Sequence, residues 1–301
     1  MTRPAAKQHG TVVATFGRRY EVETSAGAPV IDCVSRGKKH FAACGDQVEI
    51  TSTGPGQGVI ETLLPRRNYL ERSDAFKRKS IAANVDQVLV LAAVEPWASE
   101  QFISRVLLIA HAAGVPALIA LNKTDLPGAA AARARLSMFE AAGHSIISLK
   151  AKPRDGSPAS AQEALLERLS GKCTVLAGQS GMGKSSLINA LIPDARAATS
   201  ELSSALKSGK HTTTFSRLYR MDAASTIIDC PGMQEVGIHH LDFAELENGF
   251  GEFAPYLGHC RFANCRHTHE PDCALRSASA SGAVNSARLA LFQQLATELK
   301  R

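Results

Sequence analysis

The sequence lacks any long hydrophobic run. Its uninterrupted apolar stretches are no longer than runs such as VLVLAAV at residues 88–94, and the first residues, MTRPAAKQHGTVV, contain no apolar run of signal-peptide length. A membrane-spanning helix needs about 20 consecutive apolar residues, and a secretory signal needs an apolar centre of about 7–15 residues. Because both are missing, we expect a cytoplasmic protein without a membrane partner.

Cysteine is sparse and odd in number, and the chain has no internal repeat or long low-complexity tract. Three of the seven Cys lie between residues 260 and 273. In a reducing compartment such crowding favours metal binding over a disulfide framework. The remaining Cys stand singly in apolar or mixed surroundings, and we interpret them as buried or unreactive thiols. They are Cys33, Cys44, Cys173 and Cys230.

The composition has neither the low hydrophobicity nor the charge excess of a disordered chain. With 301 residues, 45% of them apolar and 21% charged, two or three globular domains are expected. The formal charge is +6 and the pI is about 9.0. A surplus of Lys and Arg suggests an anionic partner such as nucleic acid, although a merely basic surface would give the same charge.

The first 65 residues predict a small β-barrel. From about residue 10 onward, five short β-rich runs are separated by turns: TVVATF, RYEVET, APVIDCV, DQVEIT and GVIETLL. Five such strands in about 60 residues fit an OB-type barrel, a fold that often binds oligonucleotides. The basic segment RGKKH at 36–40 is either part of such a surface or an ordinary solvated loop. We interpret residues 64–80 as a basic connector with few strands.

From about residue 82 the pattern changes to apolar strands alternating with helices. DQVLVLAAVEP, VPALIALNKTD and CTVLAG read as buried strands, and SEQFISRVLLIAHAAG and AAARARLSMFEAAG each read as one helix. This alternation predicts a parallel sheet covered by helices, with a ligand at the carboxyl ends of the strands. After about residue 240 we expect helix and loop, then a Cys/His cluster, then a helix from about residue 281.

The segment GQSGMGKSS predicts a phosphate-binding loop. It satisfies the pattern G-x-x-x-x-G-K-[ST], follows an apolar strand and precedes an amphipathic helix. Backbone N–H groups of such a loop surround phosphate oxygens, the Lys reaches the β- and γ-phosphates, and the first Ser ligates Mg²⁺. A structural Gly-rich turn is the alternative. The predicted binding residues are Gly178, Gln179, Ser180, Gly181, Met182, Gly183, Lys184, Ser185 and Ser186.

The segment NKTD predicts a guanine-binding loop. An ionised Asp125 only accepts hydrogen bonds, so it suits the N1–H and N2–H₂ groups of guanine and not the N1 acceptor of adenine. Asn122 would hold the loop and the stem of Lys123 would cover the base, while Thr124 completes the segment. A turn without a ligand would show a similar pattern. An ATP-dependent P-loop enzyme, such as a small-molecule kinase, is a rival that this loop disfavours.

The segment STIIDCPG and the polar stretch before it predict the two switches. Asp229 ends an apolar strand and would hold Mg²⁺ through water, and the N–H of Gly232 would meet a γ-phosphate. One Thr of 212–214 would complete the Mg²⁺ shell, and we choose Thr213. Many small GTPases carry a water-positioning Gln after this Gly, but Met233 stands there. His211 would orient the water instead, or is simply an exposed loop residue.

The segment CRFANCRHTHEPDC predicts a structural zinc site. Three thiolates and one imidazole within fourteen residues suit tetrahedral Zn²⁺, and a complete set of four protein ligands indicates a structural role. The three cysteines are Cys260, Cys265 and Cys273. The residues alone leave the imidazole open between His267 and its neighbours His259 and His269.

The order of the motifs indicates a circular permutation. In ordinary GTPases the phosphate loop comes first and the guanine loop last, whereas here residues 122–125 precede residues 178–186. Compact domains tolerate such re-ordering when the old termini lie close together. The second switch then leads directly into the C-terminal metal domain, so nucleotide state can be transmitted along that connection.

With these motifs together, the whole chain resembles the ribosome small subunit-dependent GTPase A family. The resemblance implies GTP hydrolysis stimulated by the small ribosomal subunit, rRNA contact, and a role in late maturation of that subunit. It implies zinc ligation by Cys260, Cys265, His267 and Cys273. It matches His211 to the family's switch histidine and Met233 to its hydrophobic replacement of the catalytic Gln. The segment SLKA at 148–151 departs from the family's guanine-supporting loop.

We therefore predict a multi-domain α/β protein: an OB-type RNA-binding barrel over 1–70, a circularly permuted GTPase domain over 71–240 and a helical zinc-binding domain over 241–301. The predicted function is a slow GTPase, with Lys184 and His211 as catalytic residues, that acts as a checkpoint on the small subunit. The alternative is an RNA-docking protein in which GTP is a conformational clamp. The expected cofactors are one structural zinc and magnesium with GTP, and the expected state is a monomer.

Overall fold

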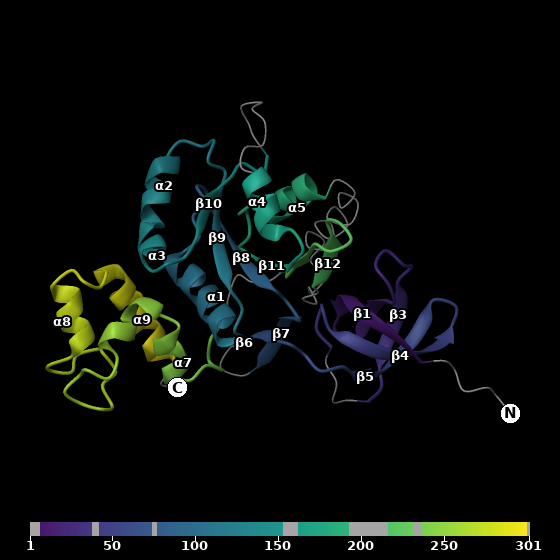
Figure 1. Ribbon diagram of the computed structural model, residues 1–301, viewed down its shortest axis with the longest axis horizontal. Helices are drawn as coiled ribbons and strands as arrows, with labels where there is room; N and C mark the ends of the chain where they lie inside the picture. Colours follow the sequence, from purple (N-terminus) through teal and green to yellow (C-terminus); the bar gives the residue numbers. More distant parts are fainter. Residues whose placement is uncertain are drawn as a thin grey trace.

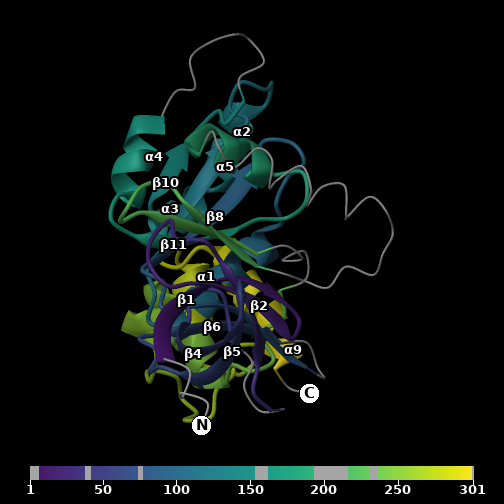
Figure 2. The same cartoon turned by 90° about the vertical axis from the view of Figure 1, so that its right-hand side faces the viewer.

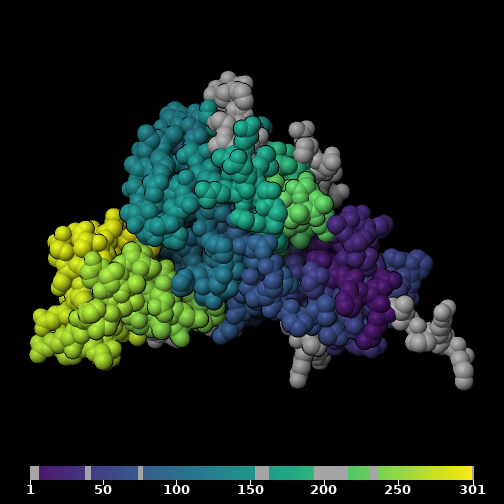
Figure 3. Space-filling view, in the orientation of Figure 1, coloured from purple at the N-terminus to yellow at the C-terminus, as the bar shows by residue number. Residues whose placement is uncertain are grey.

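The protein consists of a barrel, a central mixed sheet with helices, and a C-terminal helical region, arranged in that order from one end to the other (Figures 1 and 3). The computed structural model describes residues 7–37, 42–73, 77–152, 162–192, 216–230 and 236–299. Within these ranges, no helix is both long enough and apolar enough to cross a membrane.

The N-terminal barrel has five strands and is closed, as the sequence predicts. The strand order is β1-β2-β3-β5-β4, and β4 pairs back onto β1. The strands are β1 (Lys7–Phe16), β2 (Arg19–Glu23), β3 (Ile31–Ser35), β4 (Gln47–Gly54) and β5 (Gln57–Leu63). Alternate apolar residues of these strands fill the interior, since successive side chains of a strand point to opposite faces. Buried members include Val12, Tyr20, Val48 and Ile50.

Residues 69–73 and 78–83 form two paired strands, so the prediction of a strand-poor connector was wrong there. The strands β6 (Tyr69–Ser73) and β7 (Arg78–Ala83) pair antiparallel in a separate two-stranded sheet. The first half of β7 is exposed and only Leu70 and Ser73 of β6 are buried, so the segment carries little of the apolar alternation that marks a strand. Burial of its last three residues against the central domain compensates for its polar composition.

The central sheet has the order β10-β9-β8-β11-β13-β12, with all strands parallel except the edge strand β12. All seven residues of β8 are buried, which is the pattern of a central parallel strand covered on both faces. The strands are β8 (Gln87–Ala93), β9 (Ala117–Asn122), β10 (Ile146–Ser148), β11 (Cys173–Ala177), β12 (Arg217–Arg220) and β13 (Thr226–Asp229).

The barrel and the central sheet share one continuous set of strand pairings. Over Lys7–Thr11, strand β1 pairs with β4, and at Ala14 it pairs with β12. An irregularity between Val12 and Ala14 shifts the register of β1 against β2. Such a bulge bends a strand and allows its outer edge to change partner. Eleven strands therefore form a single hydrogen-bonded sheet.

Among the described residues, five helices accompany the central strands. Helix α1 begins after Ser99, whose side chain accepts a hydrogen bond from the N–H of Phe102, and it contacts β8 and β9. The predicted single helix over residues 130–143 is instead two short helices separated at Leu136. The five are α1 (Glu100–Ala112), α2 (Ala129–Arg135), α3 (Ser137–Ala141), α4 (Gln162–Leu169) and α5 (Lys184–Leu191). In the view from the barrel end, α2, α4 and α5 lie in the upper part of the molecule, above the barrel strands (Figure 2).

The C-terminal region packs its helices around buried aromatic rings and against α1. Phe250, Phe253 and Phe292 lie with ring centroids 5.1–5.5 Å apart. The last helix begins at Ser286, later than the predicted start near 281, because Asn285 caps it and Gly282, with φ at +80°, separates it from a preceding short helix. The elements are α7 (Phe243–Asn248), the 3₁₀ helix η2 (Gly251–Tyr256), α8 (Ala274–Ala280) and α9 (Ser286–Glu298).

Candidate nucleotide and metal sites

The predicted phosphate loop connects β11 to α5. Gly181 and Gly183 have φ values of +81° and +94°, a conformation that glycine adopts at little cost. A Cβ on Gly183 would lie 2.4 Å from the Nδ2 atom of Asn122, so no other residue fits without a shift. Ser180, Gly181 and Ser185 are exposed. The loop therefore presents free space at the N-terminus of α5, where backbone N–H groups favour an anion.

Lys184 and Asp229 lie close enough at this edge to influence each other's charge. The Nζ atom of Lys184 donates to the carbonyl oxygens of Gly178 and Gln179, at 2.7 and 3.3 Å. Burial lowers the pKa of Lys184, and the nearby Asp229 opposes that shift. Burial likewise raises the pKa of Asp229 above its ordinary value, while Lys184 opposes it.

One carboxylate oxygen of Asp229 has no hydrogen-bond partner. Its Oδ1 atom is buried and unpaired in the part of the chain that the structure describes. A buried polar atom without a partner costs about 1–3 kcal/mol, so such an atom in a native fold indicates a missing ligand or water. An oxygen of this kind beside a phosphate loop fits a Mg²⁺ ion and its water shell.

The predicted guanine loop lies directly beside the phosphate loop. Asn122, which is 2% exposed, donates from Nδ2 to the carbonyl oxygen of Met182 at 2.9 Å. Its Oδ1 atom accepts from the backbone N–H groups of Lys123 and Ala151, at 2.8 and 3.0 Å. One buried amide thus joins segments that are 60 residues apart in the sequence.

The remaining residues of NKTD surround the same opening. Lys123 has a φ of +62°, and Thr124 donates from its hydroxyl to the carbonyl of Leu149 at 3.1 Å. Asp125 is partly exposed. The segment 148–151 therefore supports the NKTD loop from behind through Leu149 and Ala151, although its sequence departs from the expected supporting loop.

Two residues after β8, Glu95 and Pro96, also contact the NKTD and phosphate loops, and no motif in the sequence indicated them. The carbonyl oxygen of Glu95 accepts from Lys123 Nζ at 2.7 Å. The ring of Pro96 lies so close to Gly181 that a Cβ there would approach its Cγ atom to 3.0 Å. The available signal was positional, because residues that follow the most buried strand of a parallel sheet lie at its ligand-binding edge.

Several predicted residues cannot be placed. His211, Thr213 and Gly232 lie outside the described residues, as do Met233 and the neighbouring Thr212 and Thr214. The strands that flank them are placed, since β12 begins at Arg217 and β13 ends at Asp229. Their roles stay predictions.

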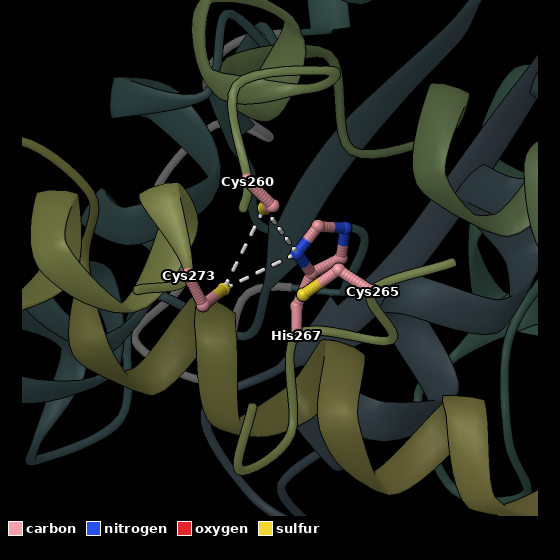
Figure 4. Close-up of side chains that lie close together, drawn as sticks. All are labelled: Cys260, Cys265, His267 and Cys273. Carbon is pink, nitrogen blue, oxygen red and sulfur yellow. Dashed lines mark hydrogen bonds between the residues drawn. The ribbon is translucent and has the colours of Figure 1, made fainter. Parts of the chain in front are cut away.

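The Cys/His cluster converges on one point in the C-terminal region (Figure 4). The ligand atoms of Cys260, Cys265, His267 and Cys273 all lie within 4.8 Å of one another. The Nδ1 atom of His267 is 3.5 Å from the Sγ of Cys260 and 3.3 Å from the Sγ of Cys273, and these two sulfurs are 3.9 Å apart. The four residues can bind one metal ion.

His267 is the imidazole of the cluster, whereas His259 and His269 are exposed. Its other ring nitrogen, Nε2, lies 2.8 Å from Oε1 of Glu247 in α7. A carboxylate in this position fixes the ring so that Nδ1 faces the metal. The sequence analysis missed Glu247, since it lies 20 residues from His267 and no ligand spacing marks it.

The fold and these sites define a class of protein. A phosphate loop after β11 and an NKTD loop after β9, joined at the same edge of the sheet and with NKTD earlier in the chain, characterise a circularly permuted P-loop GTPase. The RsgA GTPase family model matches residues 63–239. A relative from Burkholderia pseudomallei named "Small ribosomal subunit biogenesis GTPase RsgA" is 47% identical over 98% of this chain and 95% of its own length. The chain therefore belongs to the RsgA GTPase family and is a GTP hydrolase.

Two solved structures agree with the architecture. The crystal structure of YjeQ from Thermotoga maritima has a TM-score of 0.72 at 29% identity and covers 98% of this chain and 99% of its own. The structure of YloQ, described as a circularly permuted GTPase, has a TM-score of 0.68 at 23% identity and covers 100% of this chain and 97% of its own. The second likeness concerns the fold alone.

Proposed function

We propose that this GTPase binds the small ribosomal subunit and hydrolyses GTP as a checkpoint in its late assembly. The observation that carries the GTP site is the hydrogen bond from Asn122 to Met182, because it joins the guanine and phosphate loops into one opening. The small ribosomal subunit is proposed as the partner because the relatives are named small ribosomal subunit biogenesis GTPases. Such a protein works in the cytoplasm.

Each part of the opening has a role in this proposal. Asp125 accepts the N1–H and N2–H₂ protons of guanine, with Lys123 and Thr124 beside it. Lys184 leaves its carbonyl partners and binds the β- and γ-phosphates, since these anions attract an ammonium group more strongly than neutral carbonyls do. Ser185, Thr213 and Asp229 hold Mg²⁺. When bound, that ion neutralises charge on the β- and γ-phosphate oxygens.

The attacking water is positioned from the switches. The usual Gln is replaced by Met233, so the chain alone hydrolyses GTP slowly. We propose that His211 orients the water when the small subunit is bound, with Gly232 contacting the γ-phosphate. Binding of the partner then raises the rate.

The bound metal of the C-terminal cluster is proposed to be one structural zinc ion. Tetrahedral Zn²⁺ with bonds of about 2.3 Å to sulfur and 2.0 Å to nitrogen gives S–S and S–N separations of about 3.8 and 3.5 Å. Among Cys260, His267 and Cys273 the S–S separation is 3.9 Å and the S–N separations are 3.3–3.5 Å, and Sγ of Cys265 lies within 4.8 Å of all three atoms. Three thiolates select a soft or borderline metal, and four protein ligands leave no position open for catalysis.

The proposed domains are the RNA-binding barrel over 1–70, the GTPase domain over 71–240 and the zinc domain over 241–301. The net charge of +6 supports contact with rRNA. A monomer is proposed, with the subunit as its partner.

Single-turnover GTP hydrolysis with and without isolated small subunits tests the function. We expect slow hydrolysis by the protein alone and an increase of at least about tenfold with subunits, in the direction of the increases that partner-supplied groups give other GTPases. Large subunits are the control. Equal rates with and without small subunits would refute the checkpoint while leaving GTP binding intact.

An Asp125→Asn variant tests whether the NKTD loop recognises the guanine base. Its amide presents a donor where guanine also has donors, so we expect GTP affinity to fall by at least about a hundredfold. Xanthine carries an acceptor at C2, and binding of xanthosine triphosphate should improve. Unchanged preference for GTP would remove Asp125 from the site.

A further inference from the structure

A single lateral row of residues connects the barrel to the proposed Mg²⁺ residue. In the pairing registers, Glu21 of β2 lies opposite Ala14 of β1, Ala14 lies opposite Arg217 of β12, and Arg217 lies opposite Asp229 of β13. Residues in one row of a sheet point to the same face. The side chains of Glu21, Arg217 and Asp229 therefore share a face of the sheet.

Arg217 has a carboxylate on each side and binds the one that belongs to the barrel. Its Nη2 atom lies 3.0 Å from Oε2 of Glu21. It reaches over Ala14, whose small side chain leaves the path open. The Oδ1 atom of Asp229 meanwhile has no hydrogen-bond partner among the residues described, although directly opposite residues have Cβ atoms only about 4.5–5.5 Å apart.

The junction holds β12 in this register by further contacts. The N–H of Thr15 donates to the carbonyl of Ser216 at 3.0 Å, and Nε of Arg220 donates to Glu23 of the barrel at 2.9 Å. The side chain of Glu23 is 8% exposed. Arg217 cannot move toward Asp229 by sliding of the strand, so only rotation of its own side chain would bring it there.

We propose that Glu21 is a positioning residue for the GTPase reaction: by binding Arg217 it keeps the guanidinium away from Asp229 and leaves that carboxylate available for Mg²⁺. The inference rests on the proposed Mg²⁺ role of Asp229. Released from Glu21, Arg217 would pair with Asp229 and compete with the cation, since both are attracted to the same charge. The barrel thereby influences the cation affinity of the nucleotide site.

The test is a Mg²⁺ titration that is followed in two ways: by GTP hydrolysis at saturating GTP and, without turnover, by the Mg²⁺-dependent affinity for a fluorescent GDP analogue. In Glu21→Gln, we expect the Mg²⁺ concentration for half-maximal rate to rise roughly two- to fivefold, the size of effect that a partly exposed ion pair produces. The rate at saturating Mg²⁺ should be unchanged, because the cation displaces Arg217. Glu21→Asp, which keeps the charge, should recover most of the shift.

The decisive arm removes the competitor. Arg217→Gln, and the double variant Glu21→Gln with Arg217→Gln, should both show the Mg²⁺ dependence of the wild type. Glu49→Gln is the matched control, because Glu49 pairs with Lys7 at 2.8 Å within the barrel and its strand β4 pairs with β1 and β5. A wild-type Mg²⁺ curve for Glu21→Gln, a shift that persists in the double variant, or an equal shift in Glu49→Gln would each overturn the inference.

A separate result would signal failure of the proposed function itself. Asp229→Asn should lose Mg²⁺-dependent hydrolysis, and if it does not, Asp229 is not the Mg²⁺ residue. If Asp229→Asn loses hydrolysis but Glu21→Gln behaves as the wild type, only the role of Glu21 is refuted.

Discussion

At the scale of single residues, the buried and partly unpaired carboxylate of Asp229 lowers the stability of the ligand-free fold. Its carboxylate is buried at the end of β13 and has one unpaired oxygen within the described chain. Lys184 supplies the compensating charge but donates its hydrogen bonds to Gly178 and Gln179 instead.

The pH dependence of Asp229→Asn follows from this burial. Burial holds the pKa of Asp229 above its ordinary value of 3.8, although Lys184 opposes the shift. A carboxyl with a raised folded-state pKa stabilises the fold below the unfolded pKa and loses that contribution as pH rises through the folded pKa. As pH is lowered from neutral toward about 4, the ligand-free wild type should therefore gain unfolding free energy relative to Asp229→Asn. Urea unfolding of both proteins across that range measures it, and parallel curves would contradict it.

Some residues of the candidate sites could be predicted from the sequence alone and others could not. The NKTD and phosphate-loop residues could be predicted because binding chemistry fixes both residue type and spacing. The three Cys were readable for the same reason, but the choice of His267 over His259 and His269 needed either the family resemblance or the fold. Glu247 and the carbonyl of Glu95 act by position alone, so no local pattern distinguished them.

At the scale of elements, helix α7 supports the Cys/His cluster. A capping box of Asp242 and Glu245 fixes its first turn, with hydrogen bonds of 2.7 and 2.8 Å. Two residues after Glu245, the carboxylate of Glu247 lies 2.8 Å from the ring nitrogen Nε2 of His267. The orientation of this short helix therefore determines the orientation of a metal ligand.

Removing Glu247 should weaken metal binding without removing a ligand. We expect Glu247→Ala to lower zinc affinity by roughly 10–100-fold, because carboxylates that orient a metal-bound His have effects of that size. Glu247→Gln keeps an acceptor oxygen and should recover part of the loss. Competition against a chromophoric chelator measures the affinity. Glu245→Gln is the control, since it keeps the capping box, and an equal loss there would show that the helix and not the carboxylate matters.

Strands were predicted correctly where their packing produces a regular pattern of apolar residues in the sequence. Strand β8 and the barrel strands were readable because a buried parallel strand is continuously apolar and a barrel strand alternates. The paired strands β6 and β7 were not predicted because the exposed half of β7 is polar. The pairing of β1 with β12 was not predictable, since an edge-to-edge contact between distant segments leaves no periodic pattern in either one.

At the scale of the whole molecule, one buried arginine joins the C-terminal region to the GTPase domain. Arg288 of α9 is 2% exposed, and its Nε atom lies 2.6 Å from Glu252. Its guanidinium carbon lies 4.3 Å from the ring centre of Phe250 and 5.1 Å from that of Phe139 in α3. The zinc-bearing region is therefore fixed on the helical layer of the central sheet.

Loss of this arginine should destabilise the fold strongly. Because Arg288→Met leaves Glu252 without its partner, we expect the unfolding free energy to fall by about 3 kcal/mol, the lower end of the range for breaking a buried pair. Arg261→Met removes an exposed pair with Asp272 in the same region and should cost less than about 1 kcal/mol. Denaturant unfolding with zinc present compares them, and equal losses would contradict the interface role of Arg288.

The pairing of β1 with β12 also has a consequence for synthesis on the ribosome. The barrel strands emerge first, but the partner of Ala14 is Arg217, about 200 residues later. At about 5–20 residues per second, the outer edge of β1 waits roughly 10–40 s for its neighbour. During that interval the nascent barrel exposes an unpaired strand edge, the kind of surface that recruits other chains. The bulge after Val12, which bends β1 at this point, shortens the straight edge that the growing chain presents.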